Sequence, residues 1–117
     1  YHFGDFEMKT YDQLKENPDY QAWVNDKNGM IACPQGESTL EFRTRVSAGF
    51  AKILENINKE KNLSRDSIVV CHGGVISLIM GICFPEVKQN IFQWQPDPGR
   101  GYTLNFVDEE AVSYEAI

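Results

Sequence analysis

The chain has 117 residues, of which 42% are hydrophobic and 24% charged, so it fits a single globular domain rather than a disordered, collagenous or disulfide-rich protein. Its 11 Lys and Arg residues against 17 Asp and Glu residues give a net charge of -6, which argues against nucleic acid or an anionic membrane as its main partner. A small anionic ligand stays open, because a few local donors suffice to hold a phosphate.

The first third of the chain is predicted to form two short helices followed by a loop. Thr10 is a typical N-cap residue at the start of a helix over residues 10–16, which must end before Pro18. Pro18 occupies the first position of the second helix. Apolar residues recur at helical spacing there, and we expect the helix to bury them: Tyr20, Trp23 and Val24. Turn-forming residues over 25–36 indicate a loop.

A long amphipathic helix is predicted next. Ser38 and Glu41 match a capping box, in which each side chain satisfies a free backbone N–H at the helix start. We therefore interpret them as a cap and not as catalytic groups. Apolar residues then recur at helical spacing and predict a helix that runs to about Asn62: Leu40, Val46, Phe50, Ile53, Leu54 and Ile57.

The second half of the chain is predicted to contain a buried strand, a buried helix and a terminal hairpin. Residues 68–71 are a short, β-branched apolar run, which is typical of a strand covered on both faces. Residues 75–83 are apolar nearly all round and predict a buried helix. The remaining apolar runs are predicted to be loop and strand, the last two forming a hairpin: 91–94, 102–107 and 111–117. This order of elements favours an α/β fold.

The join between the predicted strand and helix, Cys71-His72-Gly73-Gly74, is the main candidate for a functional site. In open α/β sheets, ligands bind beyond the carboxyl ends of the strands, and a helix N-terminus favours an anion. The glycines let the backbone approach a ligand closely. A histidine there can hold a phosphate, stabilise transition-state charge or be phosphorylated. The alternative is a turn histidine whose ring bonds to a neighbour, with the glycines needed only for the turn.

Other candidate residues have simpler interpretations. Arg100 lies in a Gly-rich loop from which it can reach a phosphate, whereas Arg43 and Arg45 are interpreted as surface or ion-pair residues of the long helix. Cys71 is flanked by apolar residues and is expected to pack, and His2 is expected to be a surface or packing residue. Three cysteines without a C-x-x-C pair indicate free thiols in a reducing, cytoplasmic setting and no metal site. No apolar run approaches the roughly 20 residues that span a bilayer.

Four segments of the sequence, in order, resemble the histidine phosphatase superfamily, the phosphoglycerate-mutase-like group. VVCHGGVI at residues 69–76 resembles the second histidine motif of that family, and FGDFEMKTYDQL at residues 3–14 resembles its F-G-x-[WF]-E segment. GES at residues 36–38 resembles the start of its long helix, and WQPDPGRGYTLNF at residues 94–106 resembles the tail of bacterial relatives. The FGDFEM form is most similar to α-ribazole phosphatases of cobalamin biosynthesis. The resemblance covers essentially the whole chain.

The resemblance implies a three-layer α/β/α fold, of which residues 1–117 form the C-terminal part of a single histidine phosphatase domain. It implies hydrolysis of a phosphomonoester through a phosphohistidine, without a cofactor, and favours α-ribazole 5'-phosphate as the phosphorylated small molecule. His72 matches the second histidine, which holds the phosphate, and the Gly73 N–H would contact the same group. The alternatives are a phosphoglycerate mutase, a broad-specificity sugar-phosphate phosphatase, and a non-catalytic module that binds a phosphorylated ligand or a partner.

One departure from the family pattern is large. No Arg-His-Gly sequence, which carries the nucleophilic histidine of the family, occurs in the 117 residues, and Glu7 matches only the second glutamate of the F-G segment. We therefore expect the activity to belong to a parent protein with a further N-terminal segment, and this chain alone to be inactive. The family's Arg-His-Gly strand would pair beside residues 68–71, whose apolar edge is otherwise exposed. We expect that segment or a second chain, for instance in a homodimer, to complete the sheet.

Overall fold

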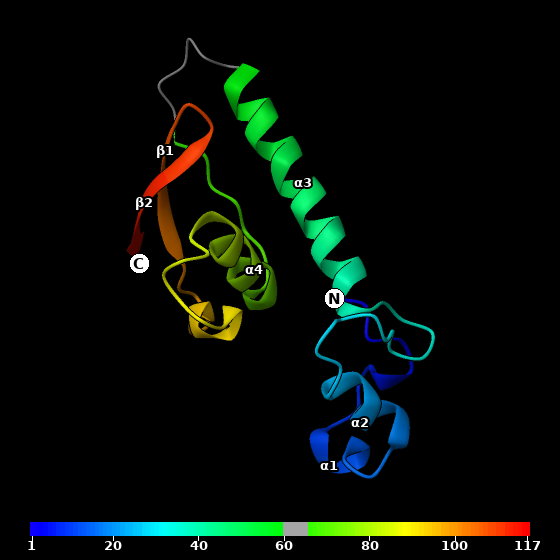
Figure 1. Ribbon diagram of the computed structural model, residues 1–117. Coiled ribbons are helices and arrows are strands. Elements are labelled where there is room, and N and C mark those ends of the chain that lie inside the picture. Colours follow the sequence, from blue (N-terminus) through cyan, green and yellow to red (C-terminus); the bar gives the residue numbers. More distant parts are fainter. Residues whose placement is uncertain (60–65) are drawn as a thin grey trace. The chain divides into compact units, whose positions relative to one another are not determined.

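The computed structural model describes residues 1–59 and 66–117 (Figure 1). The chain divides into two compact units, Tyr1–Arg45 and Val46–Ile117, and each is described by itself. Helices and one small sheet make this a mixed helix and strand fold. The elements, with 3-10 helices written η, are η1 (Gly4–Phe6), α1 (Tyr11–Leu14), α2 (Pro18–Val24), α3 (Thr39–Lys59), α4 (Gly73–Cys83), η2 (Ile91–Trp94), β1 (Tyr102–Val107) and β2 (Glu110–Ala116).

The short helices of the first unit begin at side-chain caps, as predicted. Thr10 caps α1 in a capping box with Gln13, since the Gln13 N–H donates to Thr10 Oγ1 and the Thr10 N–H donates to Gln13 Oε1. Asn17 Oδ1 accepts the Asp19 N–H at 2.8 Å at the start of α2, and Pro18 occupies its first position. The two predicted helices are therefore confirmed.

The core of the first unit is small and aromatic. Phe6, Leu14 and Cys33 are buried, and Tyr1, Tyr20 and Trp23 pack against them. Trp23 Nε1 donates to Tyr1 Oη at 2.9 Å, which satisfies the indole N–H. The prediction that Val24 is buried with this face is wrong, because its side chain is 55% exposed. The seven-residue helix α2 has room for only Tyr20 and Trp23 on the side that meets the core.

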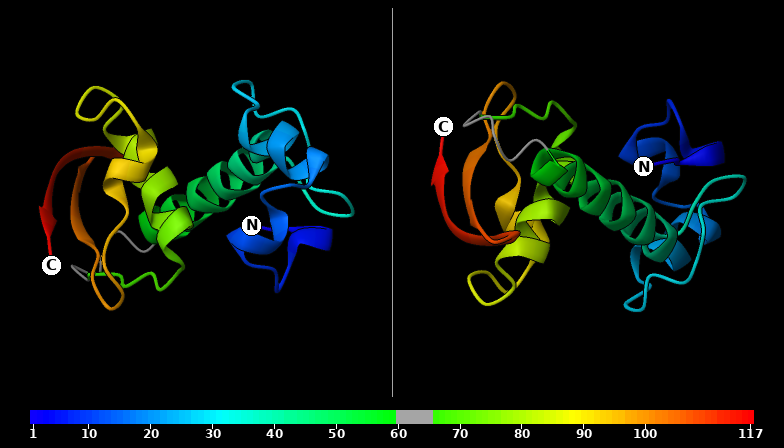
Figure 2. Two further views of the ribbon diagram at one scale, coloured as in Figure 1. Left: turned by 90° about the horizontal axis from the view of Figure 1, so that it is seen from below. Right: turned by 90° about the horizontal axis from the view of Figure 1, so that it is seen from above.

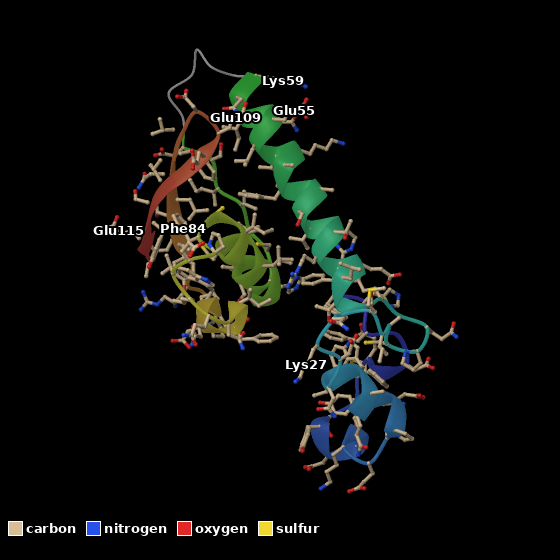
Figure 3. The ribbon with its side chains drawn as sticks, in the orientation of Figure 1. Lys27, Glu55, Lys59, Phe84, Glu109 and Glu115 are labelled. Atoms are coloured by element: carbon tan, nitrogen blue, oxygen red, sulfur yellow. The ribbon has the colours of Figure 1, made fainter. Side chains whose placement is uncertain are left out.

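The long helix α3 begins at the predicted capping box. Ser38 Oγ accepts the Glu41 N–H at 3.1 Å, and Glu41 Oε2 accepts the Ser38 N–H at 2.8 Å. Near its other end, Glu55 and Lys59 form an ion pair at 3.2 Å, one turn apart (Figure 3). The predicted end at Asn62 lies outside the described residues. Among the described residues, no helix combines the length and hydropathy that crossing a membrane requires.

The second unit is centred on Trp94, whose side chain is 1% exposed. Its ring meets Tyr114 edge to face at 5.0 Å, and Tyr102 Oη donates to the Trp94 carbonyl at 3.1 Å. Phe84, the C-cap residue of α4, has its ring centroid 4.9 Å from that of Tyr114, with the two rings tilted by 57°, so that the hairpin lies beside α4 (Figures 2 and 3). Residues 91–94, predicted to be loop or strand, form the 3-10 helix η2, which buries Trp94 against α4.

The predicted hairpin is confirmed. Strands β1 and β2 pair antiparallel in a two-stranded sheet, with an irregularity between Asn105 and Phe106. Asp108 and Glu109 have φ values of 49° and 70°, the left-handed conformation of a tight two-residue hairpin turn. Within the described residues the sheet consists of these two strands, which is too small to show three layers. The three-layer arrangement therefore stays a prediction.

Two predictions about burial in the second unit are wrong. Residues 68–71 are in no strand, and Ile68 and Val70 are 90% and 92% exposed. Within the described residues no strand pairs with this segment, so it has no sheet in which to be buried. Helix α4 begins at Gly73 and is only partly buried: Leu78 and Met80 lie inside, while Ile82 is exposed. It packs against η2, and its buried face includes the polar Ser77 as well as Leu78 and Met80.

Candidate functional site

The His72-Gly73-Gly74 sequence forms the start of α4. His72 is the N-cap residue, in an extended conformation, and its carbonyl accepts the N–H groups of Val75 at 2.9 Å and Ile76 at 3.0 Å. Its imidazole is exposed and makes no capping bond. The amides of Gly73 and Gly74 are among those that a helix leaves without an intrahelical acceptor. Together with the helix dipole, they make this end of α4 favourable for an anion.

A cavity of about 270 Å³ adjoins this helix start. Its wall is formed by the first turn of α4 and by the loop after η2: Cys71, Gly73, Ile76, Gln95, Pro96, Asp97, Pro98, Gly99 and Arg100. A bond of 3.0 Å from the Arg100 N–H to the Asp97 carbonyl closes this loop, and Gly99 supplies its positive φ of 79°. Of the predicted site residues, the structure thus brings Gly73 and Arg100 to one cavity. His72 adjoins it in the chain but is not part of its wall.

The loop contributes two cavity residues that the sequence analysis did not single out, Gln95 and Asp97. The Gln95 carboxamide occupies the space that a Cβ on Gly73 would fill, and its Oε1 lies 3.1 Å from Ser77 Oγ. Asp97 places a carboxylate on the wall that also carries Arg100. Both residues lie within the WQPDPGRG segment, so their closeness to Arg100 in the sequence was the available signal.

Cys71 belongs to the wall of this cavity and is half-buried. Burial raises the pKa of Cys71 above its ordinary value. The neutral thiol therefore predominates near pH 7, and only the thiolate is a strong nucleophile. This favours a packing role for Cys71 over nucleophilic attack. All three cysteines are free thiols.

In the first unit, Arg45 forms the predicted ion pair. Its Nη2 lies 2.8 Å from Glu37 Oε1, and its Nε donates to Glu37 Oε2 at 3.3 Å. Glu37 Oε1 also accepts the His2 N–H at 2.7 Å. His2 Nδ1 in turn accepts the Gly4 N–H at 3.1 Å, and Glu7 Oε1 accepts the Phe3 N–H at 2.9 Å, so both side chains fold the local backbone. Arg43 lies exposed on α3.

His2, Glu7, Glu37 and Arg45 line a second, open cavity of about 500 Å³. Its wall contains two carboxylates, Glu7 and Glu37, and the guanidinium of Arg45, which is already bound to Glu37. Such a wall disfavours a phosphate, because the negative charges are not offset by an unpaired guanidinium. The cavity at the start of α4 is therefore the better candidate for an anion.

The Glu37 pair predicts a pH dependence of stability. The hydrogen bond from Arg45 holds the pKa of Glu37 below its ordinary value. Because the folded pKa is the lower one, the pair stabilises the fold above the unfolded pKa of about 4.3, and this is lost as the pH falls through the folded pKa. We expect Glu37→Gln to lower the free energy of unfolding at pH 7, and the difference from wild type to shrink below about pH 4.

Urea denaturation at a series of pH values measures this difference. Glu16→Gln, which changes an exposed carboxyl of the same unit, is the matched control and should show no such trend. A Glu37→Gln effect that stays constant from pH 3 to pH 7 would show that the ion pair does not carry the stabilisation.

Comparison with known proteins supplies the family. The family model described as histidine phosphatase superfamily (branch 1) matches residues 1–114. No curated protein is similar enough to count as a match, and no solved structure is either. The matched range contains both the His72-Gly73-Gly74 helix start and the Arg100 loop that share a cavity, and it leaves only three residues uncovered. With nearly its whole length accounted for in this way, the chain belongs to the histidine phosphatase superfamily (branch 1), whose members are generally phosphatases or mutases.

Proposed function

We propose that the chain supplies the phosphate-holding half of a phosphomonoesterase site. The observation that carries this is the meeting of Gly73 and Arg100 at one cavity, directly after His72, in a member of a phosphatase and mutase family. Amide N–H groups, a guanidinium and an imidazole are donors suited to phosphoryl oxygens. The cavity, about 270 Å³, suits a phosphoryl group better than a whole nucleotide-sized ligand, for which about 300–1,000 Å³ is typical.

In the proposed reaction, a nucleophilic histidine forms an N–P bond while the P–O bond to the alcohol breaks, and a carboxylic acid group of the further segment that carries this histidine gives its proton to the alcohol and later takes one back from the attacking water. Water then attacks phosphorus and releases phosphate and the free histidine. His72 and the Gly73 N–H stabilise the negative charge that builds up on the phosphoryl oxygens, and Arg100 assists from the loop. The 117 residues contain no Arg-His-Gly sequence, and we therefore place the nucleophilic histidine on a further polypeptide segment.

We propose α-ribazole 5'-phosphate as the substrate, on the similarity of the Phe3–Met8 segment to α-ribazole phosphatases. A phosphoglycerate or another sugar phosphate is the alternative substrate within the enzyme class. The absence of Arg-His-Gly from these residues favours a second candidate function, a module that binds a phosphorylated ligand without turning it over. The three free thiols support a reducing, cytoplasmic setting.

The exposed apolar side chains at residues 68–70 support the proposal that another strand pairs with this segment. Ile68 and Val70 are almost fully exposed, although β-branched residues in such a run favour a buried strand. We propose that a strand from an N-terminal segment or from a second chain pairs here, and that this pairing builds the three-layer α/β/α sheet of a single domain.

Titration with inorganic phosphate tests the binding half of the proposal. We expect phosphate to shift the amide NMR signals of Gly73, Gly74 and Arg100 in the ¹⁵N-labelled chain, because Gly73 and Arg100 line the cavity and Gly74 follows Gly73 in the first turn of α4. The Gly36 signal, from the other cavity, is the internal control and should stay in place. Equal signal shifts at both cavities, or no shift at Gly73 and Gly74, would contradict the proposal that phosphate binds at the start of α4. Hydrolysis of α-ribazole 5'-phosphate and of phosphoglycerates by the parent protein then ranks the substrates.

A further inference from the structure

Two consecutive glycines make an unfavourable start for a helix that must present its amides in a fixed direction. A glycine favours a helix less than alanine does, because its backbone is free to adopt many conformations. Gly73 and Gly74 occupy the first two positions of α4. The peptide between them is planar, so the direction of the Gly73 carbonyl fixes the direction of the Gly74 N–H. Any group that holds this carbonyl therefore also aims that N–H.

Ser77 holds the Gly73 carbonyl. Its Oγ donates to that oxygen at 2.9 Å, and its side chain is 1% exposed. The same Oγ lies 3.1 Å from Gln95 Oε1, so one hydroxyl proton is shared between a backbone and a side-chain acceptor. Gln95 follows η2, and η2 is anchored by the buried Trp94. The start of α4 is thus linked through the exposed residue Gln95 to the segment that follows the buried Trp94.

Gln95 also fills the space beside Gly73. A Cβ built on Gly73 would collide with the Gln95 carboxamide nitrogen and carbon. On Gly74, by contrast, a Cβ would meet nothing within 4 Å. The surroundings of the two glycines therefore differ. A neighbouring side chain occupies the space that a Cβ would need at position 73, whereas that space is open at position 74.

We propose that Ser77 and Gln95 are positioning residues that hold the Gly73–Gly74 peptide in the orientation needed to bind a phosphoryl group. This inference rests on the proposed function of the site. Gln95 acts in two ways, by sharing the Ser77 proton and by filling the volume beside Gly73. Ser77 is buried and is not part of the cavity wall, so its effect reaches the ligand through the backbone amides, whereas Gln95 also belongs to the wall.

The affinity of the chain for inorganic phosphate, measured by NMR titration, tests the positioning role. We expect Ser77→Ala and Gln95→Ala each to weaken it about fivefold, the effect of losing one ordinary hydrogen bond. The double variant should bind more weakly than Ser77→Ala alone, because Gln95 also fills the volume beside Gly73, but by less than the product of the two single effects, because the hydrogen bond they share is lost only once. Gln93→Ala, an exposed glutamine of η2, is the matched control and should bind like wild type.

Urea unfolding of the same variants separates positioning from a general loss of structure. Gly73→Ala should destabilise the chain only as far as moving the Gln95 carboxamide aside breaks its bond to Ser77, and this effect should be absent in a Gln95→Ala background. If wild type binds phosphate and Gln95→Ala binds it equally well, the positioning role is overturned while the proposed function stands. If wild type binds no phosphate, the proposed function fails and takes the positioning role with it. The unfolding cycle would still show whether Gln95 dictates the glycine at position 73.

Discussion

His72→Ala is expected to lower the rate of phosphomonoester hydrolysis by about 10²–10³-fold in the parent protein that supplies the Arg-His-Gly segment. The reason is the place of His72 at the N-cap of α4, directly before the amides of Gly73 and Gly74. Its ring is exposed and makes no capping bond, so it can turn toward a phosphoryl group without giving up a structural bond. Removing one donor that stabilises developing negative charge typically has an effect of this size.

The chain offers a matched control, because it has a second histidine. His2 lies in the first unit, where its Nδ1 accepts the Gly4 N–H, and it is not placed in the site. His2→Ala should keep the wild-type rate, and the unfolding midpoint of His72→Ala should stay close to that of wild type, since the His72 side chain is exposed and makes no capping bond. If both histidine variants hydrolyse p-nitrophenyl phosphate at the wild-type rate, His72 has no part in the mechanism.

Local signals in the sequence were sufficient to predict most of the helices. Thr10, Pro18 and Ser38 act within one helical turn of where they stand, so their effect does not depend on the rest of the fold. The turn at Asp108 and Glu109 is equally local, and the hairpin around it was predicted correctly. Where these elements begin and end depends on bonds between residues that are close together in the sequence. Such bonds can be predicted from the sequence alone.

Burial was harder to predict because it depends on residues far away in the chain. The apolar run at residues 68–71 predicts a covered strand, yet a strand is covered only when neighbours pair with it. The same limit applies to Gln95, whose role depends on the empty volume beside Gly73. Gly73 and Arg100 were both predicted as phosphate-binding residues, but only the structure brings them to one cavity.

The double substitution Ile68→Lys and Val70→Lys is expected to abolish self-association of the chain. Side chains two residues apart point to the same side of a strand, so Ile68 and Val70 would form one apolar face when the segment pairs. An exposed apolar edge is a template for pairing with another chain, and charged side chains on such an edge block it. We expect wild type to elute above its monomer mass at high concentration in size-exclusion chromatography with light scattering, and the double lysine variant to elute as a monomer at every concentration.

The control must separate strand pairing from a simple change of charge. Met8→Lys combined with Met30→Lys changes the net charge by the same two units, from -6 to -4, at two exposed apolar side chains of the first unit. It should associate like wild type, because it leaves the 68–71 segment intact. A wild-type chain that stays monomeric and monodisperse with a native-like sheet at all concentrations would contradict the proposed pairing. Association that both lysine variants suppress equally would point to general hydrophobic contact and not to a strand.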